Sequence, residues 1–140
     1  MKRLLIAGTN SGCGKTTVTL ALLSALRARG LRLSSFKCGP DYIDPMFHRR
    51  VLGVPAHNLD PFFCDAETLR SLFVTHAGAD LSLIEGVMGY YDGIGPSGTA
   101  GTYDVAESLC APVILVVNAK GMSASAGAVY RAFSAFGKKV

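Results

Sequence analysis

The stretch Gly8-Thr9-Asn10-Ser11-Gly12-Cys13-Gly14-Lys15-Thr16-Thr17 decides the fold of this chain. It follows the apolar residues 4–7 and precedes a stretch with helical periodicity, which is the setting of a phosphate-binding loop. In such a loop, backbone NH groups and the N-terminus of the next helix converge on phosphate oxygens. The sequence therefore predicts a nucleoside triphosphate site. The alternative is a glycine-rich turn that carries a surface lysine.

Two side chains of this loop suit a nucleotide. Lys15 supplies a mobile cation, and Thr16 places a hydroxyl where it can bind a Mg²⁺ ion that bridges two phosphates. The residues expected to hold the nucleotide are Asn10, Ser11, Gly12, Cys13, Gly14, Lys15, Thr16 and Thr17. In the partition branch of P-loop enzymes, position 10 would be a lysine that reaches across a dimer interface, a role that Asn10 cannot fill.

Composition restricts the class of protein. The 140 residues suffice for one α/β domain or part of one, and 49% of them are hydrophobic, as a buried parallel sheet requires. The net charge of +4 comes from dispersed basic residues without interleaved aromatic side chains, which argues against a nucleic-acid partner. No apolar run is long enough to span a bilayer, and the chain leads directly into its first strand, so we expect a cytoplasmic protein without membrane contact. The four cysteines form no C-x-x-C pair, which predicts reduced, mostly buried thiols.

Strand and helix patterns alternate along the chain. We expect strands over residues 2–8, 33–37, 80–85 and 112–117, and helices over residues 16–28, 45–51, 65–76, 103–109 and 122–136. Residues 51–65 are interpreted as irregular, and residues 86–101 as a long loop. This alternation predicts a doubly wound, mostly parallel α/β sheet of the P-loop NTPase type. Because residues 138–140 resemble the start of a further strand, we expect the chain to be the N-terminal portion of a truncated domain.

Acidic residues follow the second predicted strand, in Gly39-Pro40-Asp41-Tyr42-Ile43-Asp44-Pro45. The carboxyl ends of parallel strands meet at one edge of the sheet, so this segment should lie beside the phosphate loop. A carboxylate next to a triphosphate is repelled unless a cation lies between them, and Asp41 or Asp44 is therefore a candidate Mg²⁺ ligand. The alternative is that both are turn residues next to prolines.

A further acidic residue, Glu85, ends the apolar strand predicted over residues 80–85. Two of the next four residues are glycines, which permit close approach of a ligand and favour a Mg²⁺ or phosphate role over a solvated strand end. For Asp92, a role at the site and a role as a turn residue agree equally well with the sequence. The histidines lack metal-ligand spacing and are interpreted as packing or surface side chains; they are His48, His57 and His76.

Together these motifs resemble the N-terminal synthetase domain of the cobyrinic acid a,c-diamide synthase family, a relative of dethiobiotin synthetase. The resemblance covers nearly all 140 residues and rests on four segments, which are residues 8–17, 36–45 with His48, 85–89 with 91–93, and 111–113. It implies a glutamine-dependent amidoligase of cobalamin biosynthesis. In such an enzyme ATP phosphorylates a peripheral carboxylate (a or c) of a corrin-ring acid, and ammonia then displaces the phosphate.

The resemblance also implies roles for individual residues, with ATP and Mg²⁺ as cofactors. It assigns the metal to Thr16, Asp41 and Glu85. It assigns catalysis to Lys15, Asp41, Asp44, Glu85 and Asp92. It assigns substrate binding to Tyr42, Ile43, His48 and Tyr91. The implied partners are a tetrapyrrole polycarboxylic acid and ammonia from a C-terminal glutaminase domain, which these 140 residues do not include; a homodimer is compatible with the fold.

Other functions remain open at this point. A P-loop switch or partition-type ATPase would respond to DNA or a partner protein, although Asn10 weighs against it. A dethiobiotin synthetase-like ligase would share the phosphate loop and Glu85 but would leave residues 40–45 unexplained. The isolated stretch of 140 residues could also be inactive, binding nucleotide weakly or folding poorly.

Overall fold

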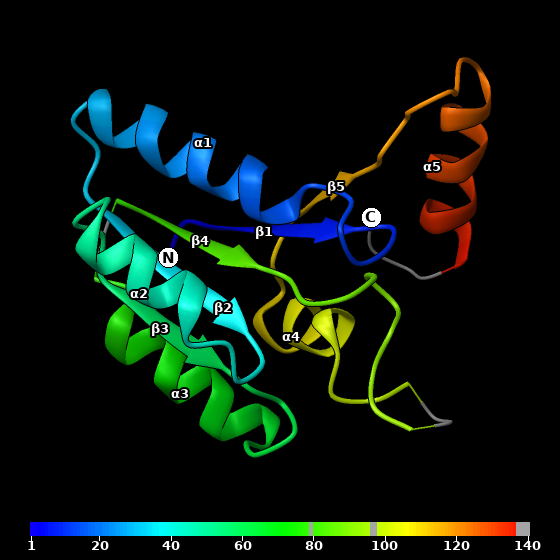
Figure 1. The fold of residues 1–140 in the computed structure, drawn as a ribbon. Helices are drawn as coiled ribbons and strands as arrows, with labels where there is room; N and C mark the ends of the chain where they lie inside the picture. The colour runs from blue at the N-terminus through cyan, green and yellow to red at the C-terminus, as the bar shows by residue number, and fades with distance from the viewer. Residues whose placement is uncertain (79, 96–97, 137–140) are drawn as a thin grey trace.

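The computed structural model describes residues 1–78, 80–95 and 98–136, in which strands and helices alternate (Figure 1). The elements are β1 (Arg3–Gly8), α1 (Lys15–Ala28), β2 (Leu33–Cys38), α2 (Ile43–Arg50), β3 (Ala56–Leu59), α3 (Ala66–His76), β4 (Leu81–Glu85), α4 (Thr102–Leu109), β5 (Val113–Val116) and α5 (Ser125–Phe136). The α/β class predicted from the alternation of patterns is confirmed.

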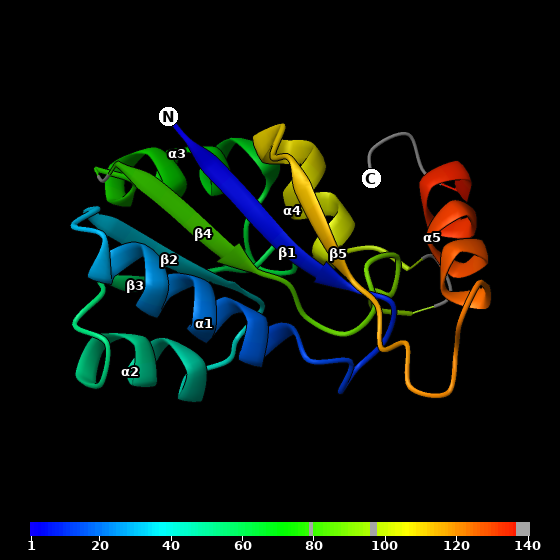
Figure 2. The ribbon, with the colours of Figure 1, turned by 90° about the horizontal axis from the view of Figure 1, so that it is seen from above.

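The five strands form one parallel sheet in the order β3-β2-β4-β1-β5. Helices α1 and α2 cover one face of the sheet, and α3 and α4 cover the other (Figure 2). This is the predicted doubly wound arrangement. All five strands end at the same edge, so the loops that follow them lie together there.

Side chains of successive strand residues point to opposite faces, and this alternation separates the core from the site. Phe36 and Ile84 belong to the buried cluster that includes Phe73 of α3, and the rings of Phe36 and Phe73 are 5.0 Å apart. The next residue in each strand, Lys37 in β2 and Glu85 in β4, therefore points to the face covered by α1 and α2. These two residues are also register partners in the parallel ladder.

Strand β3 corrects the expectation that residues 51–65 are irregular. It contains only four residues, and its two central positions, His57 and Asn58, are polar and partly exposed. An edge strand this short between Pro55 and Pro61 gives almost no alternation to detect, so its pairing with β2 determines it. The strand expected at residues 138–140 lies outside the described residues.

The cysteines fit the expected burial only in part. Cys13 and Cys38 are buried as expected, whereas Cys64 is half-buried and Cys110 is exposed, so only two of the four thiols fit that expectation.

Among the described residues, no helix has the length and apolar character needed to cross a membrane.

Replacing Phe73 with alanine should lower the free energy of unfolding by about 3–5 kcal/mol, because it empties a site between α3 and the sheet. Its neighbour Val74, on the same helix, is 55% exposed and is the matched control. Val74→Ala should change stability by no more than about 0.5 kcal/mol. Urea unfolding of both variants measures the difference, and equal effects would contradict this packing.

Candidate functional site

The phosphate loop connects β1 to α1 and turns sharply before the helix. Gly12 and Gly14 have φ angles of 75° and 107°, a region that residues with a side chain rarely adopt. Gly14 directly precedes the first residue of α1, Lys15. The loop therefore directs the positive end of the helix dipole toward the carboxyl edge of the sheet, as an anion site requires.

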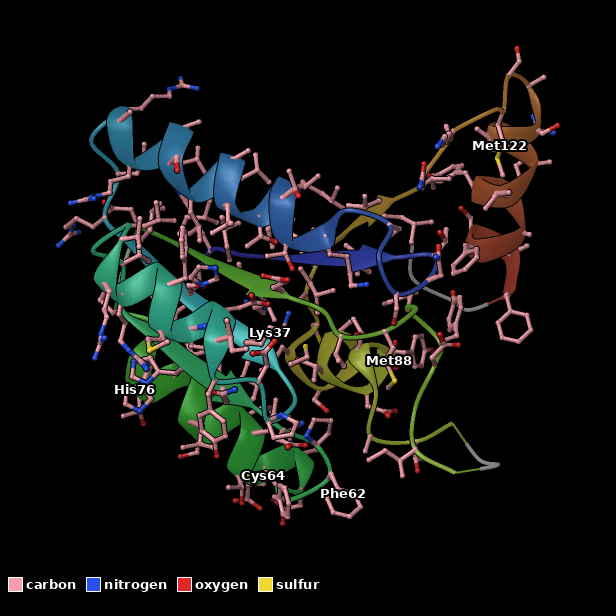
Figure 3. The ribbon with its side chains drawn as sticks, in the orientation of Figure 1. Lys37, Phe62, Cys64, His76, Met88 and Met122 are labelled. Carbon is pink, nitrogen blue, oxygen red and sulfur yellow. The ribbon has the colours of Figure 1, made fainter. Side chains whose placement is uncertain are left out.

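Lys15 is held across this loop by backbone carbonyls. Its Nζ donates hydrogen bonds to the carbonyl oxygens of Asn10, at 3.0 Å, and Met88, at 2.6 Å. Met88 lies on the segment after β4, as Figure 3 shows. The NH of Tyr90 on the same segment donates to the carbonyl of Gly8 at 2.8 Å. The phosphate loop and the segment after β4 are thus fastened together around the Lys15 ammonium.

Glu85 is the centre of the site. Its Oε1 accepts hydrogen bonds from Thr16 Oγ1, at 2.5 Å, and from Lys37 Nζ, at 2.8 Å. Lys37 Nζ also donates to Asp44 Oδ2 at 2.6 Å and lies 3.6 Å from Asp41 Oδ2. The structure therefore brings together four residues that the sequence singled out, and it adds Lys37, which the sequence analysis missed.

The electrostatics of this cluster follow from its burial. The side chain of Glu85 has no exposed surface, and burial raises its pKa although Lys37 and Thr16 oppose the shift. Burial acts to lower the pKa of Lys37, but Glu85 and Asp44 outweigh it and the net shift is upward, so Lys37 is an ammonium. One ammonium facing the carboxylates of Asp41, Asp44 and Glu85 leaves a net negative charge.

A divalent cation fits this place. The second oxygen of Glu85, Oε2, is buried and has no hydrogen-bond partner in the described part of the chain, which is costly for a carboxylate. Mg²⁺ takes oxygen ligands, and at nucleotide sites it uses one or two protein groups together with phosphates and water. Thr16 and Glu85 supply such a pair. No cluster of three His, Cys, Asp or Glu side chains with metal-binding geometry occurs among the described residues.

The residues predicted after β4 lie beside the phosphate loop. A cavity of about 440 Å³ is lined in part by Ser11, Met88, Tyr91 and Asp92. Asp92 Oδ2 accepts a hydrogen bond from the NH of Gly89 at 2.9 Å, which is the turn role left open above. The Tyr91 hydroxyl donates to the carbonyl of Phe133 in α5 at 2.7 Å. Both side chains border the cavity while stabilising its walls.

The remaining predicted substrate residues differ in accessibility. Tyr42 and Ile43, at the start of α2, are 78% and 73% exposed. His48 has no exposed surface, its Nδ1 lies 2.8 Å from Ser35 Oγ, and burial lowers its pKa. A ligand cannot touch His48 in this conformation, which favours the packing interpretation of this histidine over direct substrate contact.

Replacing Lys37 with methionine should destabilise the protein by about 3–5 kcal/mol at pH 7, because Glu85 would remain buried and charged without its partner. The pKa of Glu85, already raised, would rise further, so the folded state would bind a proton that the unfolded state lacks as the pH falls. The loss should therefore be smaller at pH 5 than at pH 7 in urea unfolding.

Two companion variants sharpen this test. The double variant Lys37→Met/Glu85→Gln removes both charges and should recover most of the stability. Arg32→Met breaks an ion pair with Asp80 that lies at the surface and should have little effect. A Lys37→Met loss that is the same at both pH values would show that charge burial is not its cause.

The chain is similar to known nucleotide-binding proteins. Residues 4–140 match the family model described as the CobQ/CobB/MinD/ParA nucleotide binding domain. The cobyrinate a,c-diamide synthase of Listeria innocua is 48% identical over 139 residues, covering 97% of this chain, and that of Thermoplasma acidophilum is 43% identical over 135 residues, covering 96%. The chain spans 30–31% of the length of these relatives.

A solved structure, the signal recognition particle receptor FtsY from Elizabethkingia anophelis, has a similar fold. Its TM-score is 0.66 over 99% of this chain and 48% of that chain, with 18% sequence identity, so the likeness concerns the fold alone. The resemblance inferred from the motifs is confirmed by the family model and the curated relatives. This chain belongs to the CobQ/CobB/MinD/ParA nucleotide-binding domain family.

Proposed function

We propose that this chain is the nucleotide-binding part of an ATP- and glutamine-dependent amidoligase. Its substrate would be cobyrinic acid or a related tetrapyrrole acid, amidated at the peripheral a and c carboxylates in cobalamin biosynthesis. The observation that carries the proposal is the Thr16–Glu85–Lys37 cluster, which joins the nucleotide loop to a buried second cation. Relatives named cobyrinate a,c-diamide synthase, 43–48% identical over nearly the whole chain, support it.

In the first step the substrate carboxylate is activated. Amides of the phosphate loop and Lys15 bind the β- and γ-phosphates, whose oxygens would replace the Asn10 and Met88 carbonyls as partners of Lys15 Nζ. Mg²⁺, held by Thr16 and Glu85, would neutralise charge on the phosphates. A carboxylate oxygen attacks the γ-phosphorus, the bond from that phosphorus to the ADP oxygen breaks, and an acyl phosphate forms. Lys37 lies where it can offset negative charge on the acceptor.

In the second step ammonia attacks the acyl carbon. The carbon–oxygen bond to phosphate breaks, and the nitrogen loses one proton, which the departing phosphate takes up. The products are the amide, ADP and hydrogen phosphate. We propose that a glutaminase domain releases this ammonia from glutamine. No nucleophile from this chain is needed, so neither Cys64 nor Cys110 requires a chemical role.

Lys15→Ala should reduce amide formation by at least about 100-fold, because it removes the cation that meets the transferred phosphoryl group. The assay uses protein expressed from the complete coding sequence, cobyrinic acid, Mg-ATP and either glutamine or ammonium, with mass spectrometry of the ring products. The matched control is Lys2→Ala, which removes an exposed lysine just before β1, at the end of the sheet away from the phosphate loop. This variant should leave the rate unchanged.

The same assay distinguishes the alternatives. ATP hydrolysis that rises with DNA or a partner protein, without amide from any ring acid, would contradict the amidoligase and favour a switch ATPase. Carboxylation and ring closure of a diamine would favour the dethiobiotin synthetase-like reaction.

A further inference from the structure

Four large apolar side chains protrude into solvent at the carboxyl edge of the sheet. Tyr42 and Ile43, at the start of α2, are 78% and 73% exposed, and Phe62 and Phe63, between β3 and α3, are 58% and 75% exposed. The two phenyl rings meet edge to face, with centroids 4.9 Å apart. We call these four residues the apolar rim. Phe62 is labelled in Figure 3, near the start of α3.

The turn that carries the two phenylalanines is held by its own hydrogen bonds. The Asp60 carboxylate accepts from the NH of Phe62 at 3.0 Å, and the Asp60 carbonyl accepts from the NH groups of Phe63, at 3.2 Å, and Cys64, at 3.0 Å. Cys64 in turn packs against the core. The phenyl rings are therefore presented by a defined turn.

The two loops of the rim are fastened to each other. The Asn58 side-chain amide donates to the carbonyls of Gly39, at 2.8 Å, and Asp41, at 2.7 Å, and the NH of Gly39 donates to the carbonyl of Leu59 at 3.0 Å. Asp41 and Asp44, which flank Tyr42 and Ile43, also face Lys37. The apolar rim is thus continuous with the cluster around Glu85.

Exposed apolar side chains that occur singly need no explanation, but a group of four on interlocked loops beside a site marks a binding surface. The position of the rim limits what can bind there. Tyr42 and Ile43 follow β2, two strands away from β1 and its phosphate loop, whereas Phe62 and Phe63 follow β3, three strands away. Because neighbouring strands lie about 4.8 Å apart, the rim extends from on the order of 10 Å to on the order of 14 Å from that loop. A small carboxylic acid cannot reach both places, whereas a macrocycle with carboxylate arms can.

We propose that Phe62 and Phe63 extend the substrate surface already expected at Tyr42 and Ile43, and that these two phenyl rings bind the ring of the acceptor substrate while one of its carboxylate arms lies at the phosphate loop. This inference rests on the proposed amidoligase function and deepens it. The phenyl and phenol rings provide apolar contacts for a large macrocycle, and Lys37, near the end of β2, lies between the strand that precedes the two phenylalanines and the strand that precedes the phosphate loop. The rim therefore selects large ring acids over small ones.

The test compares Phe62→Ala/Phe63→Ala with the control Tyr130→Ala in protein expressed from the complete coding sequence. Tyr130 is an aromatic residue of α5 that is 49% exposed. Helix α5 lies beyond β5, at the edge of the sheet opposite β3 (Figure 2). The rim variant should raise the KM for cobyrinic acid at least about tenfold, while the KM for ATP stays within about twofold of the unmodified protein. Phe62→Leu/Phe63→Leu keeps apolar area and should recover part of the loss.

The outcomes separate this inference from the function on which it rests. If the unmodified protein forms amide and the alanine variant has an unchanged KM for the ring acid, the rim does not bind the ring and the inference fails alone. The rim would then contact another binding partner, such as a second protein segment. If the unmodified protein neither binds nor amidates any ring acid, both the function and the inference fail.

Discussion

The buried pair of Lys37 and Glu85 is the interaction on which the site depends. Removing each charge from water costs several kcal/mol, and such a pair is retained only when further hydrogen bonds satisfy it. Here Lys37 also binds Asp44, and Glu85 also accepts from Thr16. Because the two residues are register partners, a slip of β2 against β4 by one position would place one charge on the opposite, apolar face. The site can therefore form only when β2 and β4 pair in this register.

The strand order explains why this pair meets the nucleotide loop. Strand β4 lies between β1 and β2, so Glu85 has the phosphate loop on one side and Lys37 on the other. Thr16 reaches it from the first turn of α1, and Asp44 approaches Lys37 from the first turn of α2. Elements far apart in the sequence thereby converge on one carboxylate, whose second oxygen has no partner among the described residues.

Much of the site could be predicted from the sequence because its signals are local. The phosphate loop is a contiguous motif, and Glu85 follows directly on an apolar strand, so neither needs knowledge of strand pairing. Lys37 was missed because its partner is 48 residues away and only the register places them together. The signal available in the sequence was a lysine inside the strand predicted over residues 33–37, and the structure shows that every residue of β2 is buried. Phe62 and Phe63 of the apolar rim were missed for a similar reason, since Asn58 joins their loop to that of Tyr42 and Ile43, and β3 is too short to recognise.

The proposed activation transfers a carboxylate oxygen of the acceptor to phosphate. The most direct measurement uses a ring acid labelled with ¹⁸O in its carboxylates, incubated with Mg-ATP and ammonium and the protein from the complete coding sequence. We predict that each amide formed is accompanied by one labelled oxygen in the inorganic phosphate. Amide formation with unlabelled phosphate would contradict it, because the carboxylate would then have been activated without an acyl phosphate.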